Sequence, residues 1–169
     1  MNLKSISIFF NFLIFVFITS PSTASSIKFN GLILSNFWIK ETIGNHKITS
    51  GYLTIENKNN FDERLETVTS EISEKTQLHN MVVKNDIMKM ENLNNGIVIK
   101  AKSKIDLKPG NYHIMFMKLH NPLKIINKYK VTLKFKNAGA VILEMPVYQK
   151  KSNNNTKHHN HHWALFYKY

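Results

Sequence analysis

The chain has 169 residues, a formal net charge of +12 and no cysteine. This length is typical of one domain, and a hydrophobic content of 43% is sufficient for a core. Because there is no thiol, disulfides, thiol nucleophiles, iron–sulfur clusters and thiolate-ligated metal sites are excluded. The lysines are spread along the chain and aromatic residues are not interleaved with them, so the positive charge does not predict nucleic-acid binding.

The first 24 residues predict a secretory signal peptide. A short positive segment, Met1 to Lys4, precedes a thirteen-residue apolar run, Ile6 to Ile18, and a stretch of small polar residues. The apolar run is short for a membrane span. Cleavage after Ala24 is expected, with an uncleaved anchor as the alternative. Residues 25–149 are therefore predicted to form an exported domain.

Short segments of alternating polarity, separated by turns rich in Asn, Gly and Pro, continue to residue 147. Such a pattern is typical of an all-β sandwich or barrel. No amphipathic helix is expected, and residues 71–75 form one helical turn at most. The expected strands are 27–34, 37–40, 51–56, 64–70, 76–83, 112–119, 130–136 and 141–147.

Methionine and histidine gather in residues 77–119, which hold five of the seven methionines and two of the eight histidines. Residues at i and i+2 of a strand point to the same face, so each group presents its imidazole and thioether side chains together. Neutral nitrogen and thioether ligands without a carboxylate suit a soft ion, Cu(I) above all. The alternative is that the methionines pack in the core and the histidines only form hydrogen bonds. The groups are His79-x-Met81, Met88-x-Met90 and His113-x-Met115-x-Met117.

Alternation along residues 112–119 divides this expected strand between two faces. Ile114 and Phe116 are assigned to the interior, which leaves His113 and Met115 on the other face, near the end of the barrel. Met117 shares that face and is expected to pack there or to support the ligands. No paired carboxylates or activated nucleophile accompany these residues, so an enzyme is not expected.

The segments HNM, DIMKM and LKPGNYHIMFMKLHNPL resemble the PCu(A)C copper chaperones, which are periplasmic Cu(I) carriers of bacteria. The signature of that family is a histidine, ten residues, a methionine, twenty-one residues and then His-x-Met. Ten residues separate His79 from Met90, as in the family, whereas twenty-two separate Met90 from His113. We place the extra residue in the turn at residues 92–95, because an insertion in a turn leaves the flanking strands in register. The resemblance covers residues 32–147.

This resemblance implies a cupredoxin-like Greek-key β-barrel or sandwich and an exported, non-enzymatic Cu(I) chaperone. It implies a periplasmic protein that delivers copper toward the CuA site of cytochrome c oxidase subunit II, directly or through a Sco-type protein. Separately, a monomer without stable membrane insertion after signal cleavage is expected. The rival interpretation is a non-catalytic Ig-like β-sandwich interaction domain with a His-rich metal-scavenging tail. The implied Cu(I) ligands are His79, Met90, His113 and Met115, with Met81 and Met88 as alternates.

Residues 150–169 form a polar segment without apolar periodicity, which predicts a flexible tail. Histidines in such a cluster bind Cu(II), Zn(II) or Ni(II) in most contexts, so a second, Cu(II) site is expected there. A passive metal buffer and a solvated linker are the alternatives. The four histidines of the tail are His158, His159, His161 and His162.

Overall fold

The computed structural model describes residues 25–149, and every regular element in this range is a β-strand. The predicted signal peptide, residues 1–24, and the predicted tail, residues 150–169, lie outside the described residues. Residues 25–149 contain no helix that is long and apolar enough to cross a membrane. The strands are β1 (Ser26–Phe29), β2 (Leu32–Lys40), β3 (Ile48–Asn57), β4 (Glu63–Thr69), β5 (Ser73–Lys84), β6 (Ile87–Asn92), β7 (Ile97–Ile99), β8 (Lys104–Leu107), β9 (His113–Leu119), β10 (Lys128–Phe135) and β11 (Gly139–Tyr148).

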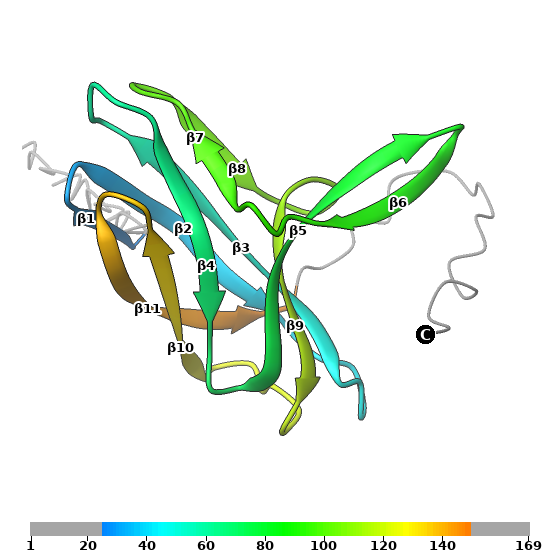
Figure 1. The fold of residues 1–169 in the computed structure, drawn as a ribbon. Coiled ribbons are helices and arrows are strands. Elements are labelled where there is room, and N and C mark those ends of the chain that lie inside the picture. The colour runs from blue at the N-terminus through cyan, green and yellow to red at the C-terminus, as the bar shows by residue number, and fades with distance from the viewer. Residues whose placement is uncertain (1–24, 150–169) are drawn as a thin grey trace, which may run out of the picture.

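The strands are hydrogen-bonded in the order β6-β5-β9-β3-β2-β11-β10-β4-β7, while β1 pairs with β2 and β8 with β3. The pairing between β2 and β11 is parallel, and the other pairings are antiparallel. Strands β4 and β5 follow each other in the chain but lie in different halves of this order, as do β9 and β10 (Figure 1). Such crossings between the halves are typical of Greek-key folds. The predicted all-β Greek-key class is confirmed.

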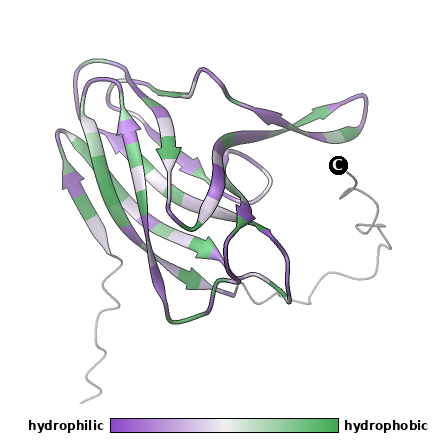
Figure 2. Ribbon diagram, turned by 60° about the horizontal axis from the view of Figure 1, so that its bottom comes forward, coloured by the Kyte–Doolittle hydropathy of each residue, from purple (hydrophilic) through white to green (hydrophobic). Residues whose placement is uncertain are grey.

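One hydrophobic core is shared by the two halves of the sheet. Ile55 of β3 and Phe116 of β9 are fully buried in it, together with Leu65 of β4 and Leu133 of β10 from the other half. Apolar and polar residues alternate along the strands, as Figure 2 shows, because successive side chains point to opposite faces. Ile114 and Phe116 face the core, as predicted, which places their neighbours in β9 on the outer face.

Two-residue turns with positive φ reverse the chain at two hairpins. Asn30 and Gly31, with φ of 43° and 78°, join β1 to β2, and Asn85 and Asp86, with φ of 51° and 60°, join β5 to β6. Positive φ at both central residues defines the type I′ turn, whose twist matches that of the paired strands. The predicted single strand over residues 27–34 is therefore wrong, because the Asn-Gly turn divides it into β1 and the start of β2.

The hairpin of β5 and β6 extends beyond the body of the sheet (Figure 1). Strand β5 pairs with β9 from Ser73 to His79, and from His79 onward it pairs with β6. Strand β6 is an edge strand, because it ends the order of the sheet. We call residues 80–92 the arm. The helical turn considered for residues 71–75 is not formed, since Ser73 already begins β5.

Candidate metal centre

Two histidines lie opposite each other where the arm meets the body of the sheet. His79 of β5 pairs directly with His113, the first residue of β9. Their ring centroids are 5.7 Å apart and the ring planes are inclined at 64°. Directly opposed residues of an antiparallel pair point to the same face, and these side chains are only 9% and 4% exposed. The outer face of the sheet thus holds two imidazoles side by side and shielded from solvent.

Each imidazole uses one nitrogen in a hydrogen bond. The Nδ1 of His113 lies 2.9 Å from the main-chain carbonyl oxygen of Asn111, and a carbonyl only accepts, so Nδ1 carries the proton and donates. The Nε2 of His79 lies 3.2 Å from Oε1 of Gln77 and donates to it in the same way. Two neutral rings therefore keep lone pairs on His113 Nε2 and His79 Nδ1.

The second nitrogen of His79 is the most informative atom of the site. Among residues 25–149, Nδ1 of His79 is a buried side-chain atom without a hydrogen-bond partner, a condition shared only with Oδ1 of Asn80. Burying a polar atom without a partner costs free energy, and native proteins rarely leave one unexplained. A metal ion that accepts this lone pair explains the arrangement.

Burial keeps both histidines in the form that binds metal. Desolvation lowers the pKa of His79 below its usual value of 6.5, and repulsion by His113, when that ring is protonated, and by Lys75 lowers the pKa further. Desolvation also lowers the pKa of His113, although the hydrogen bond to Asn111 acts in the opposite direction. Only a neutral imidazole has a lone pair for a metal, so both rings are ready to bind at neutral pH.

Met115 lies two residues beyond His113 on the same face of β9, and it is buried, at 7% exposure. Its neighbours in the flanking strands are Gln77 of β5 and Ser50 of β3, whose Oγ donates to the thioether sulfur over 3.8 Å. Met117, two residues further along, is only partly buried. The structure thus brings three of the four predicted ligands, His79, His113 and Met115, to one buried patch.

The fourth predicted ligand, Met90, lies on the arm. It pairs with Met81, and it is diagonal to His79 on the same face, a position about 7–8 Å away between Cα atoms. Long side chains span such a separation. Met90 and Met88 are 45% and 53% exposed, so the interpretation of these two methionines as core residues is wrong. The register therefore places Met90 on the same face as His79, at the solvent-exposed side of the candidate site.

Sequence reasoning missed the residues that orient these ligands. Gln77 stands two residues before His79 and so shares its face, which is a signal that the sequence contains. Asn111 contributes a main-chain oxygen, and Ser50 reaches Met115 only through the pairing of β3 with β9. No pattern in the sequence around Asn111 or Ser50 predicts these two contacts.

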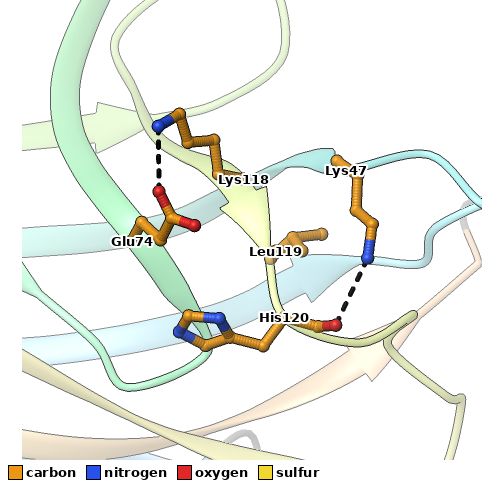
Figure 3. A pocket seen from close by; sticks show the side chains of 5 residues that line it. All are labelled: Lys47, Glu74, Lys118, Leu119 and His120. Atoms are coloured by element: carbon orange, nitrogen blue, oxygen red, sulfur yellow. Dashed lines mark hydrogen bonds and ion pairs between the residues drawn. The ribbon is translucent and has the colours of Figure 1, made fainter.

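Nitrogen, oxygen and thiolate ligands form no larger cluster in the described chain. Residues 25–149 contain no group of three or more His, Cys, Asp or Glu side chains placed to hold a metal ion. A surface pocket lies at the far end of β9 (Figure 3), where Lys118 contacts Glu74 at 2.9 Å and Lys47 donates to the carbonyl oxygen of His120. Its lining, Lys47, Glu74, Lys118, Leu119 and His120, contains no thioether, so it is distinct from the histidine pair.

Solved structures share this fold. The apo PCuAC domain from PmoF1 matches with a TM-score of 0.64 and 19% identity, over 75% of this chain and 100% of that chain. The copper-bound PCuAC domain from PmoF2 matches with a TM-score of 0.63 and 17% identity, over 75% and 99%. The Cu(I) form of DR1885 from Deinococcus radiodurans matches with a TM-score of 0.56 and 19% identity, over 77% and 85%. The resemblance to PCu(A)C domains and the cupredoxin-like fold class are confirmed.

Sequence relatives define the family more closely. Residues 32–147 match the family described as "Putative lipoprotein LpqE-like". A protein of Leifsonia xyli subsp. xyli (strain CTCB07), named "Putative lipoprotein Lxx21020", is 30% identical over 118 residues, which is 70% of each chain. The matched range includes the histidine pair, the arm and the whole core. The chain therefore belongs to the LpqE-like family.

Proposed function

We propose that this protein is an exported Cu(I) chaperone that binds one copper ion through His79, Met90, His113 and Met115. The observation that carries the proposal is the buried histidine pair, in which Nδ1 of His79 has no partner and the thioether of Met115 lies on the same face. Two imidazoles and two thioethers, without a carboxylate or a thiolate, form a ligand set for a soft ion of low charge. Copper bound to structural neighbours with the same fold supports this assignment.

The ligand set also suits release of the metal. All four ligands are neutral, so the bound ion keeps its positive charge and is held less tightly than by thiolates. Cu(I) is a d10 ion that tolerates low or distorted coordination, so its ligands can be exchanged one at a time. Met90 on the exposed arm is the ligand that an acceptor reaches first.

The acceptor that we propose is the CuA site of cytochrome c oxidase subunit II, reached directly or through a Sco-type protein. The family's description as lipoproteins supports a place in the cell envelope, and we propose the periplasm. We further propose a monomer that acts without catalysis and without binding nucleic acid. Transfer is tested by mixing the Cu(I)-loaded protein with each apo-acceptor. Failure to load either acceptor, under conditions where free Cu(I) loads both, would contradict the delivery step.

Competition for Cu(I) against a chromophoric chelator, under reducing conditions, tests the site itself. The protein for this titration is the mature chain in which His158, His159, His161 and His162 are replaced by Asn, so that the tail does not contribute. One tight equivalent is expected, and His113→Gln or Met115→Leu should abolish it while the far-UV spectrum stays rich in β-structure.

Matched controls separate ligation from packing. His46→Gln changes an exposed histidine, and Met145→Leu changes a methionine that is fully buried in the core. Both variants should bind Cu(I) like the parent chain. If His113→Gln and Met115→Leu also bind like the parent, the histidines and Met115 serve packing and hydrogen bonding, and the Ig-like interaction domain becomes the better interpretation. A separate titration with Cu(II), without reductant, compares the unmodified tail with the Asn-substituted tail and measures whether the four tail histidines add a Cu(II) site.

A further inference from the structure

The arm carries a group of methionines that the four-ligand site does not use. Met81 and Met90 are directly opposed across β5 and β6, and Met88 is two residues from Met90 on the same face. Met88 and Met90 are about half exposed, and Met81 is only partly buried. Packing therefore does not account for these side chains, because methionine is otherwise used to fill gaps in cores.

Register places the three thioethers within reach of one ion. Directly opposed residues such as Met81 and Met90 have Cβ atoms about 4.5–5.5 Å apart, and Met88 is diagonal to Met81 at about 7–8 Å between Cα atoms. The unbranched, flexible side chain of methionine lets each sulfur move by several ångströms. The hairpin is held by its own strand pairing and by the type I′ turn at Asn85 and Asp86, so the backbone that presents the sulfurs is fixed.

The charged residues of the two strands of the arm lie on the face opposite the methionines, and Asp86 lies in the turn. Lys84 and Glu91 form an ion pair there, and Lys89 points the same way, because these positions alternate with the methionines. The methionine face is completed by Val83, which is 66% exposed and opposite Met88. This face therefore offers thioethers and apolar surface without a carboxylate or ammonium group, which are conditions for a soft ion of low charge.

We propose that Met81, Met88 and Met90 form a second, solvent-facing Cu(I) site that loads the buried site. This inference rests on the proposed function, because Met90 belongs to both ligand sets. Copper from solution binds first to the three thioethers of the arm. It then exchanges Met81 and Met88 for His79, His113 and Met115, while Met90 stays bound throughout. The ion keeps its oxidation state. Two steps each replace one neutral ligand by another, and a third step adds the fourth neutral ligand.

Methyl NMR of the full chain, labelled with 13C at the methionine methyl groups, tests whether the arm binds metal. The probe is Ag(I), a soft d10 ion that is stable to oxidation, and the protein is the His113→Gln variant, in which the buried site is disabled. The methyl signals of Met81, Met88 and Met90 should shift together during the titration, whereas those of Met117 and the core residue Met145 should not. Methyl signals of the arm that stay unchanged up to saturation of the tail would overturn the proposal.

Loading kinetics on the otherwise intact barrel test the route. With the four tail histidines replaced by Asn, the double variant Met81→Leu/Met88→Leu should accept Cu(I) from a chelator, and return it, about tenfold more slowly in both directions. Met117→Leu, on the same face of the sheet but outside the arm, is the matched control and should keep the parent rates. Leucine keeps volume and apolarity, so the fold is expected to persist.

The outcomes separate this inference from the proposed function. If the double variant accepts Cu(I) more slowly but returns it at an unchanged rate, its affinity is lower, and Met81 and Met88 are ligands of the final site. If Met117→Leu slows both rates equally, the effect is not specific to the arm. Either result overturns the loading site. Neither result affects binding at His79 and His113. Conversely, if the parent chain binds no Cu(I) at the histidines while the arm methyl groups still shift, the proposed function fails and the arm site stands alone.

Discussion

At the scale of single residues, the two site histidines differ in the nitrogen that each leaves free. His113 presents Nε2 because the main chain of Asn111 holds its Nδ1, and His79 presents Nδ1 because Gln77 holds its Nε2. Partners of this kind fix the tautomer and the ring orientation of a ligand and raise its basicity. The carbonyl of Asn111 belongs to the backbone, whereas the amide of Gln77 can be replaced.

Gln77→Leu is therefore expected to lower Cu(I) affinity by about 10- to 100-fold, because His79 loses the acceptor that keeps the proton on Nε2. Gln77→Glu retains an acceptor and should retain most of the affinity. Chelator competition on both variants, with far-UV spectra as a check on folding, measures the difference. Equal losses in the two variants would show that Gln77 acts through packing, and no loss in Gln77→Leu would show that the tautomer of His79 needs no support.

At the scale of elements, a buried carboxylate ties β4 to the turn between β10 and β11. Glu63 is 1% exposed, and its carboxylate accepts hydrogen bonds from the main-chain N–H groups of Arg64, Asn137 and Ala138 at 2.7, 3.0 and 2.8 Å. Hydrogen bonds to a charged group are stronger than neutral ones. These hydrogen bonds hold the first residue of β4 against the turn between β10 and β11, at one end of the sandwich.

Glu63→Ala leaves these donors without their acceptor and should lower the free energy of unfolding by about 3 kcal/mol. Glu66→Ala in the same strand is the control, since that side chain is only partly buried, and its effect should stay within about 0.5 kcal/mol. Urea unfolding of the two variants provides the measurement. The Cu(I) affinity of the folded protein should not change, because the histidine pair lies in the other half of the sheet. If Glu63→Ala lowers the free energy of unfolding no more than Glu66→Ala does, Glu63 does not stabilise the contact between β4 and the turn.

The arm contains β6, an edge strand whose free edge must be protected from pairing with other chains. As an edge strand, β6 presents unpaired backbone groups, and exposed edges invite pairing with other chains. The charged residues of the edge strand, Lys89 and Glu91, oppose such pairing, and Glu91 is ion-paired with Lys84 of β5. The exposed methionines are thus displayed on a strand that is protected by charge on its other face.

At the scale of the whole molecule, the stability of the metal-free protein should depend on pH through the two histidines. The folded state lowers the pKa of both, so below 6.5 the unfolded chain binds more protons than the folded one. The free energy of unfolding is therefore expected to be constant at pH values just above 6.5 and to fall as the pH drops below 6.5. Asp62 and Glu74, whose pKa values are also lowered, add their own losses closer to their usual values of 3.8 and 4.5.

Urea unfolding of the metal-free protein between pH 7.5 and about 5 measures this dependence. The double variant His79→Gln/His113→Gln should show a flatter profile over the same range. Saturating Cu(I) should make the profile of the parent chain steeper, because metal and protons compete for the same nitrogens. Profiles of equal slope for the parent and the double variant would show that other groups carry the pH dependence.

Much of the fold was predictable because its signals are local. Strict alternation in residues 112–119 assigned Ile114 and Phe116 to the core, and both are fully buried. The division of residues 27–34 by Asn30 and Gly31 was missed, although an Asn-Gly pair between apolar runs is a strong hairpin signal. That error concerns the first hairpin and does not affect the strands that carry the site.

The sequence by itself determined the chemistry of the candidate site. Two imidazoles and several thioethers at i, i+2 spacing, in a chain without cysteine, restrict the ligands to neutral nitrogen and sulfur, because spacing and composition are local properties. Only the tertiary structure decided that His79 faces His113, that Gln77 leaves Nδ1 of His79 unpaired, and that Met88 and Met90 are exposed on an arm. These facts depend on which strands pair and in which register, and a register between strands distant in the chain is set by the packing of the whole sheet.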